Sequence, residues 1–443
     1  MTTLLEEFAR TGVARLWAED ADLAELLAAE YRRQRDELCL VASSSVAHPS
    51  VLAAQATVAD NLTTEGYPGR RYHGGCAYAD EIERLAVLRC RALFGARYAN
   101  VQPYSGSMAN NVVLFSLLAP GDTVLSLDLA AGGHLSHGAR AAASGKFFRV
   151  VPYGVGPDGH IDYASVRALA ERERPRIVIA GASSYPRTID FDRFREIADA
   201  VDALLLADIS HISGLVATGL HPSPIDAAHV TTTSTYKQLG GPRGGLILSG
   251  RDHERPVGHR GTPLGAAIDH AVFPFFQGTP SIGSIAAKAR ALALAAEPEF
   301  ARWTRRVAAT AQELARGLAE RGLTLVTGGT DNHIVLVDLT ATGVTGAAAQ
   351  TALERCGIVV NKNMIPGDRR PPLLSSGLRL GTNVTALRGI AGPDVAECAD
   401  LVADVVTALS AGGGGTLAPD VRATVAQRVA TLTKRFPIPY YPA

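Results

Sequence analysis

Between about residues 95 and 250, short apolar runs alternate with stretches of helical periodicity. The apolar runs predict strands at residues 122–129, 176–182, 203–208, 229–235 and 244–249. Amphipathic stretches, such as residues 163–175 and 190–202, lie between several of these runs. Continuous apolar runs, in place of strict alternation, indicate strands that are buried on both faces. The pattern therefore predicts an α/β protein with a mostly parallel sheet.

The patterns on either side of this region differ from it. Residues 21–38 predict an amphipathic helix, and a long helix is expected over roughly residues 298–322. Beyond that helix, strands are expected within residues 323–339, 357–361 and 378–382, with a helix near 393–410. We therefore expect an N-terminal helical arm at 1–45, a large domain at 46–289 and a smaller α/β domain at 290–443.

Composition narrows the class of protein. The 443 residues include 43 basic and 43 acidic side chains, so the charge balance does not favour nucleic acid or an anionic membrane as a partner. The five cysteines show no CxxC spacing, which is typical of reduced thiols, and we expect no metal site. The first residues lack the apolar stretch of a signal peptide, and no run approaches the roughly 20 residues of a membrane span. These features predict a cytoplasmic protein.

Residues whose side chains can bind a ligand or take part in catalysis follow the predicted strands. A turn at 105–111 follows the strand-like ANVQPY and opens a helix, and the later strands are followed in turn by His134, by Ser183, by Asp208 with His211, and by Lys237. In open parallel sheets, ligands bind beyond the carboxyl ends of the strands. Each residue alone has a plainer explanation, such as a helix cap for the serines or Asp208. Five strand ends together favour one binding site.

Pyridoxal phosphate accounts for this set of residues. The cofactor needs a lysine for covalent attachment, a carboxylate at its pyridinium nitrogen and a cradle for its phosphate. Lys237 and Asp208 supply the first two. The turn at Ser105–Ser107 supplies the third, because N–H groups at the start of a helix bind anions. The sequence therefore predicts a pyridoxal-phosphate enzyme.

Longer motifs then show a specific resemblance. EGYPGRRYHGG (65–75), SGSMAN (105–110), AGGHLSHG (131–138), GPRGGLIL (241–248), GGTDNHIVLVDL (328–339) and VNKN (360–363) resemble the serine hydroxymethyltransferase family, from about residue 30 onward. The resemblance implies a fold-type I, aspartate aminotransferase-like transferase with a seven-stranded sheet. It implies an aldol reaction at the Cα–Cβ bond of a β-hydroxy-α-amino acid, with tetrahydrofolate as co-substrate. It also implies a homodimer or tetramer whose active sites are shared between subunits.

The resemblance assigns roles to individual positions. Lys237 is expected to bind the cofactor, Asp208 to pair with its ring nitrogen and His134 to stack on the ring. Further cofactor contacts are expected at Ser105, Gly106, Ser107, Ser183, His211, Ser234 and Gly278. On the substrate side, the expected residues are Arg379 and Ser43 for the carboxylate, Glu65 for acid–base chemistry, and Tyr72 and His73 beside them. The folate site is expected at Leu129, Gly133, Leu135 and Asn363, with Tyr72.

Several active-site positions depart from the family pattern. Tyr236 replaces a histidine beside Lys237 and is expected among the catalytic residues as a determinant of specificity. His73 replaces the second tyrosine of a pair, and Thr63 replaces a tyrosine that reaches the neighbouring subunit's cofactor. Phe275 and Phe276 replace a glycine pair, and the serines at 43–45 stand where the family has Ser-Glu-Asn.

These departures leave the substrate open. Serine is one candidate. Another is α-methylserine, which yields alanine in place of glycine. The alternative activity is that of a folate-independent L-threonine aldolase or transaldolase. A pyridoxal-phosphate protein without catalysis is a remote alternative, which the presence of both Lys237 and Glu65 disfavours.

Overall fold

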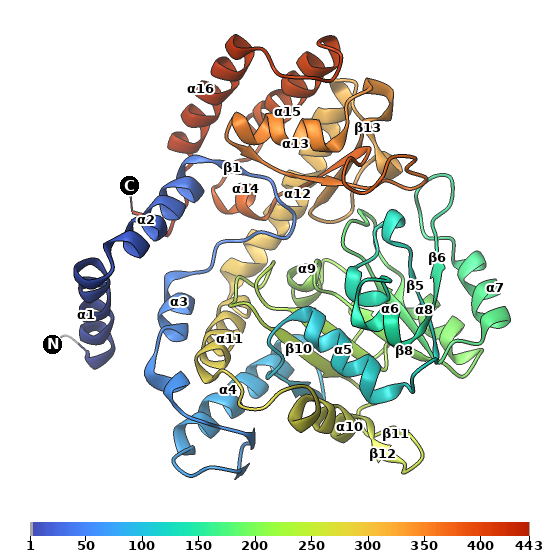
Figure 1. Cartoon of the computed structure of the whole chain (residues 1–443). Coiled ribbons are helices and arrows are strands. Elements are labelled where there is room, and N and C mark those ends of the chain that lie inside the picture. The colour runs from blue at the N-terminus through green and yellow to red at the C-terminus, as the bar shows by residue number, and fades with distance from the viewer. Residues whose placement is uncertain (1–2, 443) are drawn as a thin grey trace.

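The structure is a computed structural model that describes residues 3–442. Two bodies, one above the other in Figure 1, are joined by the long helix α12 (Pro298–Glu320). The lower body is built on a seven-stranded sheet in the order β4-β10-β9-β8-β7-β5-β6. β10 runs antiparallel to both of its neighbours, and the other pairings described are parallel, so the predicted sheet is confirmed. The strands are β4 (Tyr98–Asn100), β5 (Thr123–Leu127), β6 (Arg149–Tyr153), β7 (Ile177–Gly181), β8 (Leu204–Asp208), β9 (Val230–Ser234) and β10 (Gly245–Ser249).

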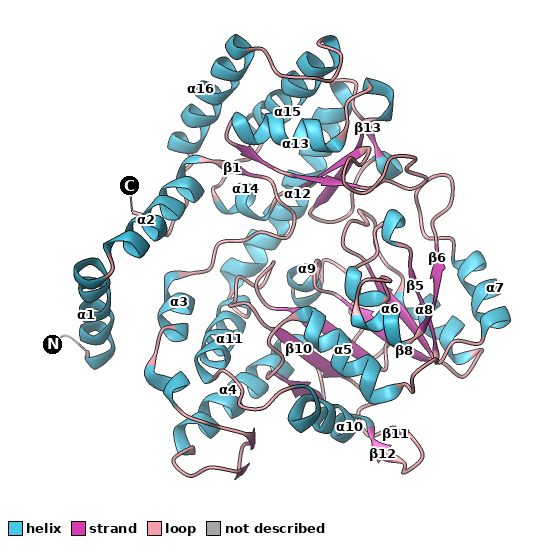
Figure 2. Cartoon of the chain, in the orientation of Figure 1, coloured by secondary structure: helices cyan, strands magenta, loops and turns pink. Residues whose placement is uncertain are grey.

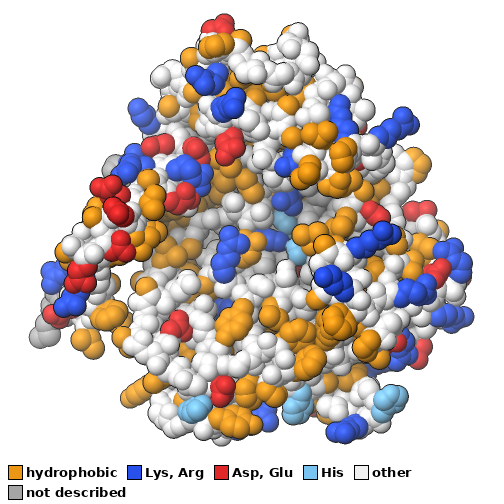
Figure 3. Space-filling model, viewed as in Figure 1, with side chains coloured by type: hydrophobic (Ala, Val, Ile, Leu, Met, Phe, Trp, Pro, Cys, Tyr) orange, Lys and Arg blue, Asp and Glu red, His pale blue; other side chains and the backbone are white. Residues whose placement is uncertain are grey.

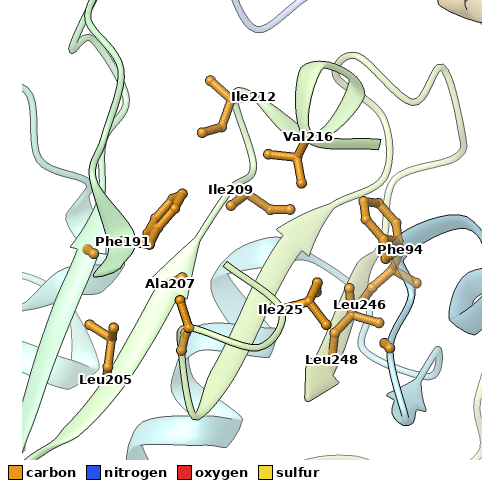
Figure 4. Close-up of a cluster of buried hydrophobic side chains, with 14 of the residues drawn as sticks. Phe94, Phe191, Leu205, Ala207, Ile209, Ile212, Val216, Ile225, Leu246 and Leu248 are labelled. Atoms are coloured by element: carbon orange, nitrogen blue, oxygen red, sulfur yellow. The ribbon is translucent and has the colours of Figure 1, made fainter. Parts of the chain in front are cut away.

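Each apolar run divides its side chains between two cores. In β7, Ile177 and Ile179 pack into the core on one face of the sheet, whereas Val178 and Ala180 pack into the core on the other. Figure 4 shows part of the second core, in which Leu205 of β8 lies among side chains from neighbouring elements. Burying an aliphatic side chain of this size contributes about 1.5–3 kcal/mol. Apolar side chains are buried on both faces of the sheet, so the strands contain continuous apolar runs and do not alternate between apolar and polar residues.

Helices cover both faces of this sheet (Figure 2). The core that contains Val178 includes residues of α4 (Ala77–Phe94), α7 (Tyr163–Glu173), α8 (Phe191–Asp199), α9 (Ser213–Ala217) and α11 (Ile282–Ala295). The opposite core includes α5 (Gly106–Leu117) and α10 (Leu264–His270). Shorter elements connect them: α3 (Pro49–Gln55), β2 (Gly66–Tyr67), β3 (Arg70–Arg71), α6 (Ala143–Phe147), β11 (Pro256–Val257) and β12 (Thr262–Pro263).

The upper body contains a four-stranded antiparallel sheet in the order β13-β14-β17-β16. Its strands are β13 (Thr324–Leu325), β14 (Ile334–Asp338), β16 (Asn361–Asn363) and β17 (Gly377–Gly381). The helices of this body are α13 (Gly346–Arg355), α14 (Asn383–Leu387), α15 (Pro393–Ala411) and α16 (Pro419–Arg435). The N-terminal strand β1 (Leu38–Cys39) pairs in parallel with β15 (Ile358–Val359), and Leu38 belongs to the upper core.

These cores locate the division between the two bodies. The boundary expected between residues 289 and 290 falls inside α11, whose Ala289 and Leu292 both belong to the lower core. The expected arm at 1–45 includes β1, which is part of the upper core, and its residues 1 and 2 lie outside the described chain, as does residue 443 of the expected small domain. We therefore propose that the large domain ends between α11 and α12, and that β1 belongs to the small domain.

A buried arginine joins the two ends of the chain. Arg388 donates to the carbonyl oxygens of Gln34, Arg35 and Glu37 at the end of α2 (Ala21–Asp36), at 2.7–3.0 Å. It also donates to the carbonyl of Phe436, 2.8 Å away, just after α16. A cation at the carboxyl ends of helices stabilises their unpaired carbonyls. Arg388 therefore holds the arm against the C-terminal helix.

The first helix, α1 (Leu4–Glu19), has no buried residue in this chain and extends away from both bodies (Figure 1). Its exposed side chains include Leu4, Phe8 and Trp17. None of the helices described between residues 3 and 442 is both long enough and apolar enough to cross a membrane. A helical arm was expected at 1–45, but the only helix predicted within it was at 21–38, so α1 is an additional helix.

Candidate active site

A cavity of about 230 Å³ lies at the carboxyl ends of the parallel strands. Figure 3 shows lysine or arginine and histidine side chains gathered in the hollow between the two bodies. The cavity is lined by Ser105, Gly106, Ser107, His134, Ala182, Ser183, Asp208, Ser210, His211, Ser234, Tyr236, Lys237, Arg243 and Gly244. Residues from all five predicted strand ends therefore meet in one place.

Lys237 lies on a loop that follows β9 and turns back toward the sheet. The loop is closed by Thr235, whose N–H donates to the carbonyl of Gly244 (3.1 Å) and whose hydroxyl donates to the carbonyl of Pro242 (2.6 Å). The Lys237 side chain is only 6% exposed. Burial, reinforced by the charge of Arg379, lowers the pKa of Lys237 to about 8, although Asp208 opposes this shift. A lysine of this kind supplies a nucleophilic amine near neutral pH.

Asp208, at the end of β8, is held as a carboxylate by its neighbours. His137 Nε2 donates to Oδ2 over 2.9 Å, Asn110 Nδ2 donates to the same oxygen over 2.8 Å, and the Ser210 N–H donates to Oδ1 over 2.9 Å. Burial alone would raise the pKa of Asp208, but the hydrogen bond and charge of His137 hold it well below its ordinary value. The carboxylate can therefore hold a proton on a cationic partner.

A chain of hydrogen bonds connects Asp208 to the ring-stacking candidate. Asn110 Nδ2 also donates to Ser136 Oγ (2.9 Å), which lies 2.7 Å from His134 Nδ1. The Thr232 hydroxyl donates to Asn110 Oδ1 and fixes that amide from the other side. Burial lowers the pKa of His134 to about 4, so its imidazole is neutral at pH 7.

Neither His137 nor Asn110 was predicted from the sequence as a site residue. Both lie inside the motifs AGGHLSHG and SGSMAN, so the motifs were the signal that could have found them.

The proposed phosphate cradle opens α5. Ser105 caps this helix by accepting from the N–H of Met108 (3.0 Å), so the plainer explanation of this serine also holds. The first N–H groups of a helix have no partner within it and can bind an anion. A Cβ on Gly106 would lie 3.1 Å from Ser234 Cβ, so a side chain here would crowd the cradle.

Arg379 of β17, in the upper body, contacts Ser183 of the cavity lining. Its Nη1 donates to the carbonyl of Ser183 (2.6 Å), and its Nε donates to Asn361 Oδ1 (3.0 Å). Burial lowers the pKa of Arg379 to about 10, and its positive charge contributes to the lowered pKa of Lys237. Ser43 lines a neighbouring cavity of about 330 Å³, which shares the walls Tyr236 and Arg243 with the first.

Tyr236 is held against Arg243, a cation that was not predicted as a site residue. The Arg243 guanidinium lies 3.8 Å from the centre of the Tyr236 ring, whereas Lys237 Nζ lies 6.0 Å from it. Stacking of a guanidinium on an aromatic ring contributes about 0.5–2 kcal/mol. The ring is therefore packed more closely against Arg243 than against the lysine.

Four other expected site residues lie together on the surface, away from this cavity. His73 Nε2 lies 3.3 Å from Glu65 Oε2, and a Cβ on Gly278 would lie 3.2 Å from Glu65 Oε1. Tyr72 is 76% exposed and meets Phe273 edge to face. Glu65, Tyr72, His73 and Gly278 thus form a separate surface cluster, which we call the Glu65 cluster. Within one chain, the structure does not bring this cluster to Lys237.

The expected folate residues lie on the rim. Leu129 and Leu135 are exposed in the loop after β5. Gly133 follows Gly132, whose carbonyl accepts from the N–H of Ser183 (2.7 Å). Asn363 Nδ2 donates to Ser184 Oγ (3.1 Å). The loop at 183–184 therefore brings the two halves of this expected site together.

The cavity fits pyridoxal phosphate by its chemistry. Two polar atoms of its lining, Ser234 Oγ and His211 Nδ1, are buried without a hydrogen-bond partner among the described residues. Buried polar groups are rarely left unpaired, so both atoms indicate a ligand. Lys237 would attach the cofactor, Asp208 would face its ring nitrogen, and the start of α5 would hold its phosphate.

Known proteins similar to this chain point the same way. The sequence model of the serine hydroxymethyltransferase family matches residues 16–402. A serine hydroxymethyltransferase of Rhodospirillum centenum is 49% identical over 430 residues, which cover 97% of each chain. Those of Zymomonas mobilis and Alkalilimnicola ehrlichii are 49% and 47% identical, over 96% and 95% of this chain and 96% of each relative.

Proposed function

Because this chain belongs to the serine hydroxymethyltransferase family, we propose that it uses pyridoxal phosphate to transfer the hydroxymethyl group of serine to tetrahydrofolate, leaving glycine. One observation carries the proposal: the buried amine of Lys237 lies in one cavity with the ionised Asp208 and the start of α5. When bound, pyridoxal phosphate withdraws electrons from the Cα of an attached amino acid. The chain must then bind, orient and exchange protons around that carbon.

We propose the following roles for its residues. Lys237 binds the cofactor through its Nζ, and Asp208 keeps a proton on the ring nitrogen. His134, neutral at pH 7, packs on the ring without adding charge. Arg379 holds the substrate carboxylate through its fork of N–H donors, with help from Ser43. Glu65 accepts the proton of the substrate hydroxyl as the Cα–Cβ bond breaks.

We propose that this last role is performed in a homodimer, by the Glu65 cluster of the partner subunit. The cluster lies outside the cavity of its own chain, and the apolar side chains of α1 are available to contact a second copy. Mixing a Lys237→Ala chain with a Glu65→Gln chain tests this. Random hybrids should recover about a quarter of wild-type activity, because one site in four is intact. Absence of any recovery would contradict shared sites.

A second substrate, α-methylserine, is favoured by the position of Tyr236. Its ring stacks on Arg243, 3.8 Å away, and its centre lies 6.0 Å from Lys237 Nζ, so we propose that the site accepts an extra methyl group on Cα beside the lysine. Thr63 is smaller than the tyrosine that the family has at this position. If the partner subunit completes the site, this threonine would also leave more space near the substrate. On this proposal, α-methylserine yields alanine, and Tyr236→His lowers turnover of α-methylserine relative to serine.

Turnover of L-serine, α-methylserine and L-threonine, each with and without tetrahydrofolate, tests both proposals. Folate-dependent glycine from serine supports the first, and alanine from α-methylserine supports the second. If the enzyme forms glycine and acetaldehyde from threonine without folate, and forms no folate-dependent product from any of the three substrates, both proposals would be wrong and the enzyme would be an aldolase. If the protein is folded and yellow from bound pyridoxal phosphate but turns over none of these amino acids, the result would favour the non-catalytic alternative.

We also propose a cytoplasmic location. The five cysteines are free thiols in the structure, and four of them are buried. Unpaired thiols are typical of a reducing compartment.

A further inference from the structure

A second buried lysine lies behind the cofactor cavity. Lys288 belongs to α11, and its side chain is only 1% exposed. Its Nζ donates to three backbone carbonyls, those of Val101 (2.6 Å), Pro103 (3.0 Å) and Gly245 (3.1 Å). Neither the proposed chemistry nor the family motifs quoted above include this residue.

The three carbonyls belong to the two backbone segments that flank the phosphate cradle. Val101 and Pro103 lead from β4 into Ser105, which caps α5, and Gly245 begins β10 directly after Gly244 of the cavity lining. The two segments also meet directly, because the Gly245 N–H donates to the Pro103 carbonyl (2.8 Å). Lys288 therefore joins both sides of the cradle from below.

This junction has no spare room. A Cβ on Gly244 would lie 2.3 Å from Lys288 Cε, and a Cβ on Gly245 would lie 2.3 Å from the Ser105 carbonyl oxygen. Such distances are well inside van der Waals contact, so Gly244 packs tightly on the lysine side chain and Gly245 packs tightly on Ser105. A displacement of Lys288 would therefore be transmitted to the start of α5.

The charged form of Lys288 fits its surroundings. An ammonium has three N–H donors, which match the three carbonyls, whereas a neutral amine has two and would leave one buried carbonyl unpaired. Burial lowers the pKa of Lys288 to about 7, and Cys90 and Glu83 of the packed helix α4 act in the opposite direction. The three carbonyl oxygens also favour the ammonium.

We propose that Lys288 is a positioning residue for the phosphate of the cofactor. Its ammonium fixes residues 101–105 and 244–245 in the orientation in which the first N–H groups of α5 face the cavity. The inference rests on the proposed function only in requiring that the cavity bind a phosphorylated ligand. It predicts that Lys288 affects affinity for the phosphate and leaves affinity for the pyridine ring unchanged.

The test compares pyridoxal phosphate with pyridoxal, which has the same ring and aldehyde but lacks the phosphate. Each is titrated into the apoenzyme of the wild type and of Lys288→Met, which keeps an unbranched side chain one atom shorter and removes the charge and the N–H donors. We expect the affinity for pyridoxal phosphate to fall about tenfold or more, because the cradle loses its orientation. The affinity for pyridoxal should stay within about twofold.

Arg388→Met is the matched control. Arg388 is also a buried cation that donates to backbone carbonyls, but it lies at the ends of α2 and α16. Both variants should melt at lower temperature as apoenzymes. In Lys288→Met alone, the extra stability given by a fixed concentration of pyridoxal phosphate should also shrink, because that gain depends on affinity.

Two results would overturn the inference. Equal loss of affinity for both ligands, or equal effects of the two variants, would give Lys288 a purely structural role. If Lys288→Met does not fold, Lys288→Gln, which retains two N–H donors, takes its place. In this variant, the affinity for pyridoxal phosphate relative to that for pyridoxal should be lower than in the wild type, though by less than the full loss expected for Lys288→Met. A ratio equal to that of the wild type would also overturn the inference. Failure of the wild type to bind pyridoxal phosphate would instead refute the proposed function.

Discussion

In the apoenzyme, Lys237 should lose its proton at a much lower pH than an ordinary lysine. Burial is the largest cause, the charges of Arg379 and Arg243 act in the same direction, and together they lower the pKa from 10.5 to about 8. At pH 7, a lysine with this pKa has about one tenth of its amines uncharged, against about one in three thousand for an ordinary lysine. The gain in nucleophilic amine is therefore roughly 300-fold.

The composition of the chain makes this titration accessible to NMR. The sequence contains only five lysines: Lys146, Lys237, Lys288, Lys362 and Lys434. Apoenzyme labelled with ¹³C at lysine Cε should give five signals, and the signal missing from Lys237→Arg assigns Lys237. Its chemical shift is then followed from pH 6 to pH 11, and we expect a midpoint near pH 8.

Two variants should move that midpoint in opposite directions. Asp208→Asn removes a negative charge that favours the protonated amine, so the pKa of Lys237 should fall further. Arg243→Gln removes a positive charge that disfavours it, so the pKa should rise. A wild-type midpoint near pH 10, or a shift of both variants in the same direction, would refute the electrostatic account of this lysine.

Three further predictions concern stability and binding. The unfolded chain keeps the Lys237 proton up to about pH 10, whereas the folded chain releases it near pH 8, so the folded state becomes more stable as pH rises between these values. In urea titrations, the unfolding free energy of the wild type minus that of Lys237→Met should therefore increase by about 3 kcal/mol over this range. A difference that does not change with pH would contradict this prediction. Asn110→Ala should lower the unfolding free energy by about 2–3 kcal/mol, because Asp208, Ser136 and Thr232 each lose a partner; a loss below about 0.5 kcal/mol would show that the network is unimportant. Arg379→Lys should raise KM for serine about tenfold or more, because a lysine cannot reproduce the two parallel N–H donors of the guanidinium. The affinity for pyridoxal phosphate should change little, and an equal loss of cofactor affinity would argue against a role of Arg379 in substrate binding.

Some of this architecture could be predicted because local pattern and tertiary environment agree. Strand β7 is apolar throughout, and β8 is apolar up to Asp208, because both faces of the sheet are buried, and this signal is independent of the rest of the chain. In contrast, β6 includes Pro152 and lies at the edge of the sheet, so its pattern is weak and it was not predicted. The exposed α1 also gave no burial pattern that could distinguish it.

The candidate site shows the same contrast. Asp208 and Lys237 could be named because each follows a strand, and strand ends converge by topology. His137 and Asn110 act through hydrogen bonds to Asp208, which lies 71 and 98 residues away in sequence, so only the folded chain identifies them. The separation of the Glu65 cluster from Lys237 is likewise a property of three-dimensional distance, which a motif does not contain.

The contacts of Arg388 have a consequence for how the chain matures during its synthesis. The segment before Ser43 is held by β15 and, through Arg388, by the end of α16, so its binding partners are among the last parts of the chain to be translated. At about 5–20 residues per second, translation takes roughly 20–80 seconds to proceed from Leu38 to Phe436. Until both β15 and α16 have been translated, the nascent arm lacks its full set of contacts and its apolar side chains are available to chaperones. The seven-stranded sheet, whose strands all precede residue 250, can meanwhile form on the ribosome. Ser43 should therefore reach its proposed place beside the substrate only late in synthesis, once β15 and α16 have been translated.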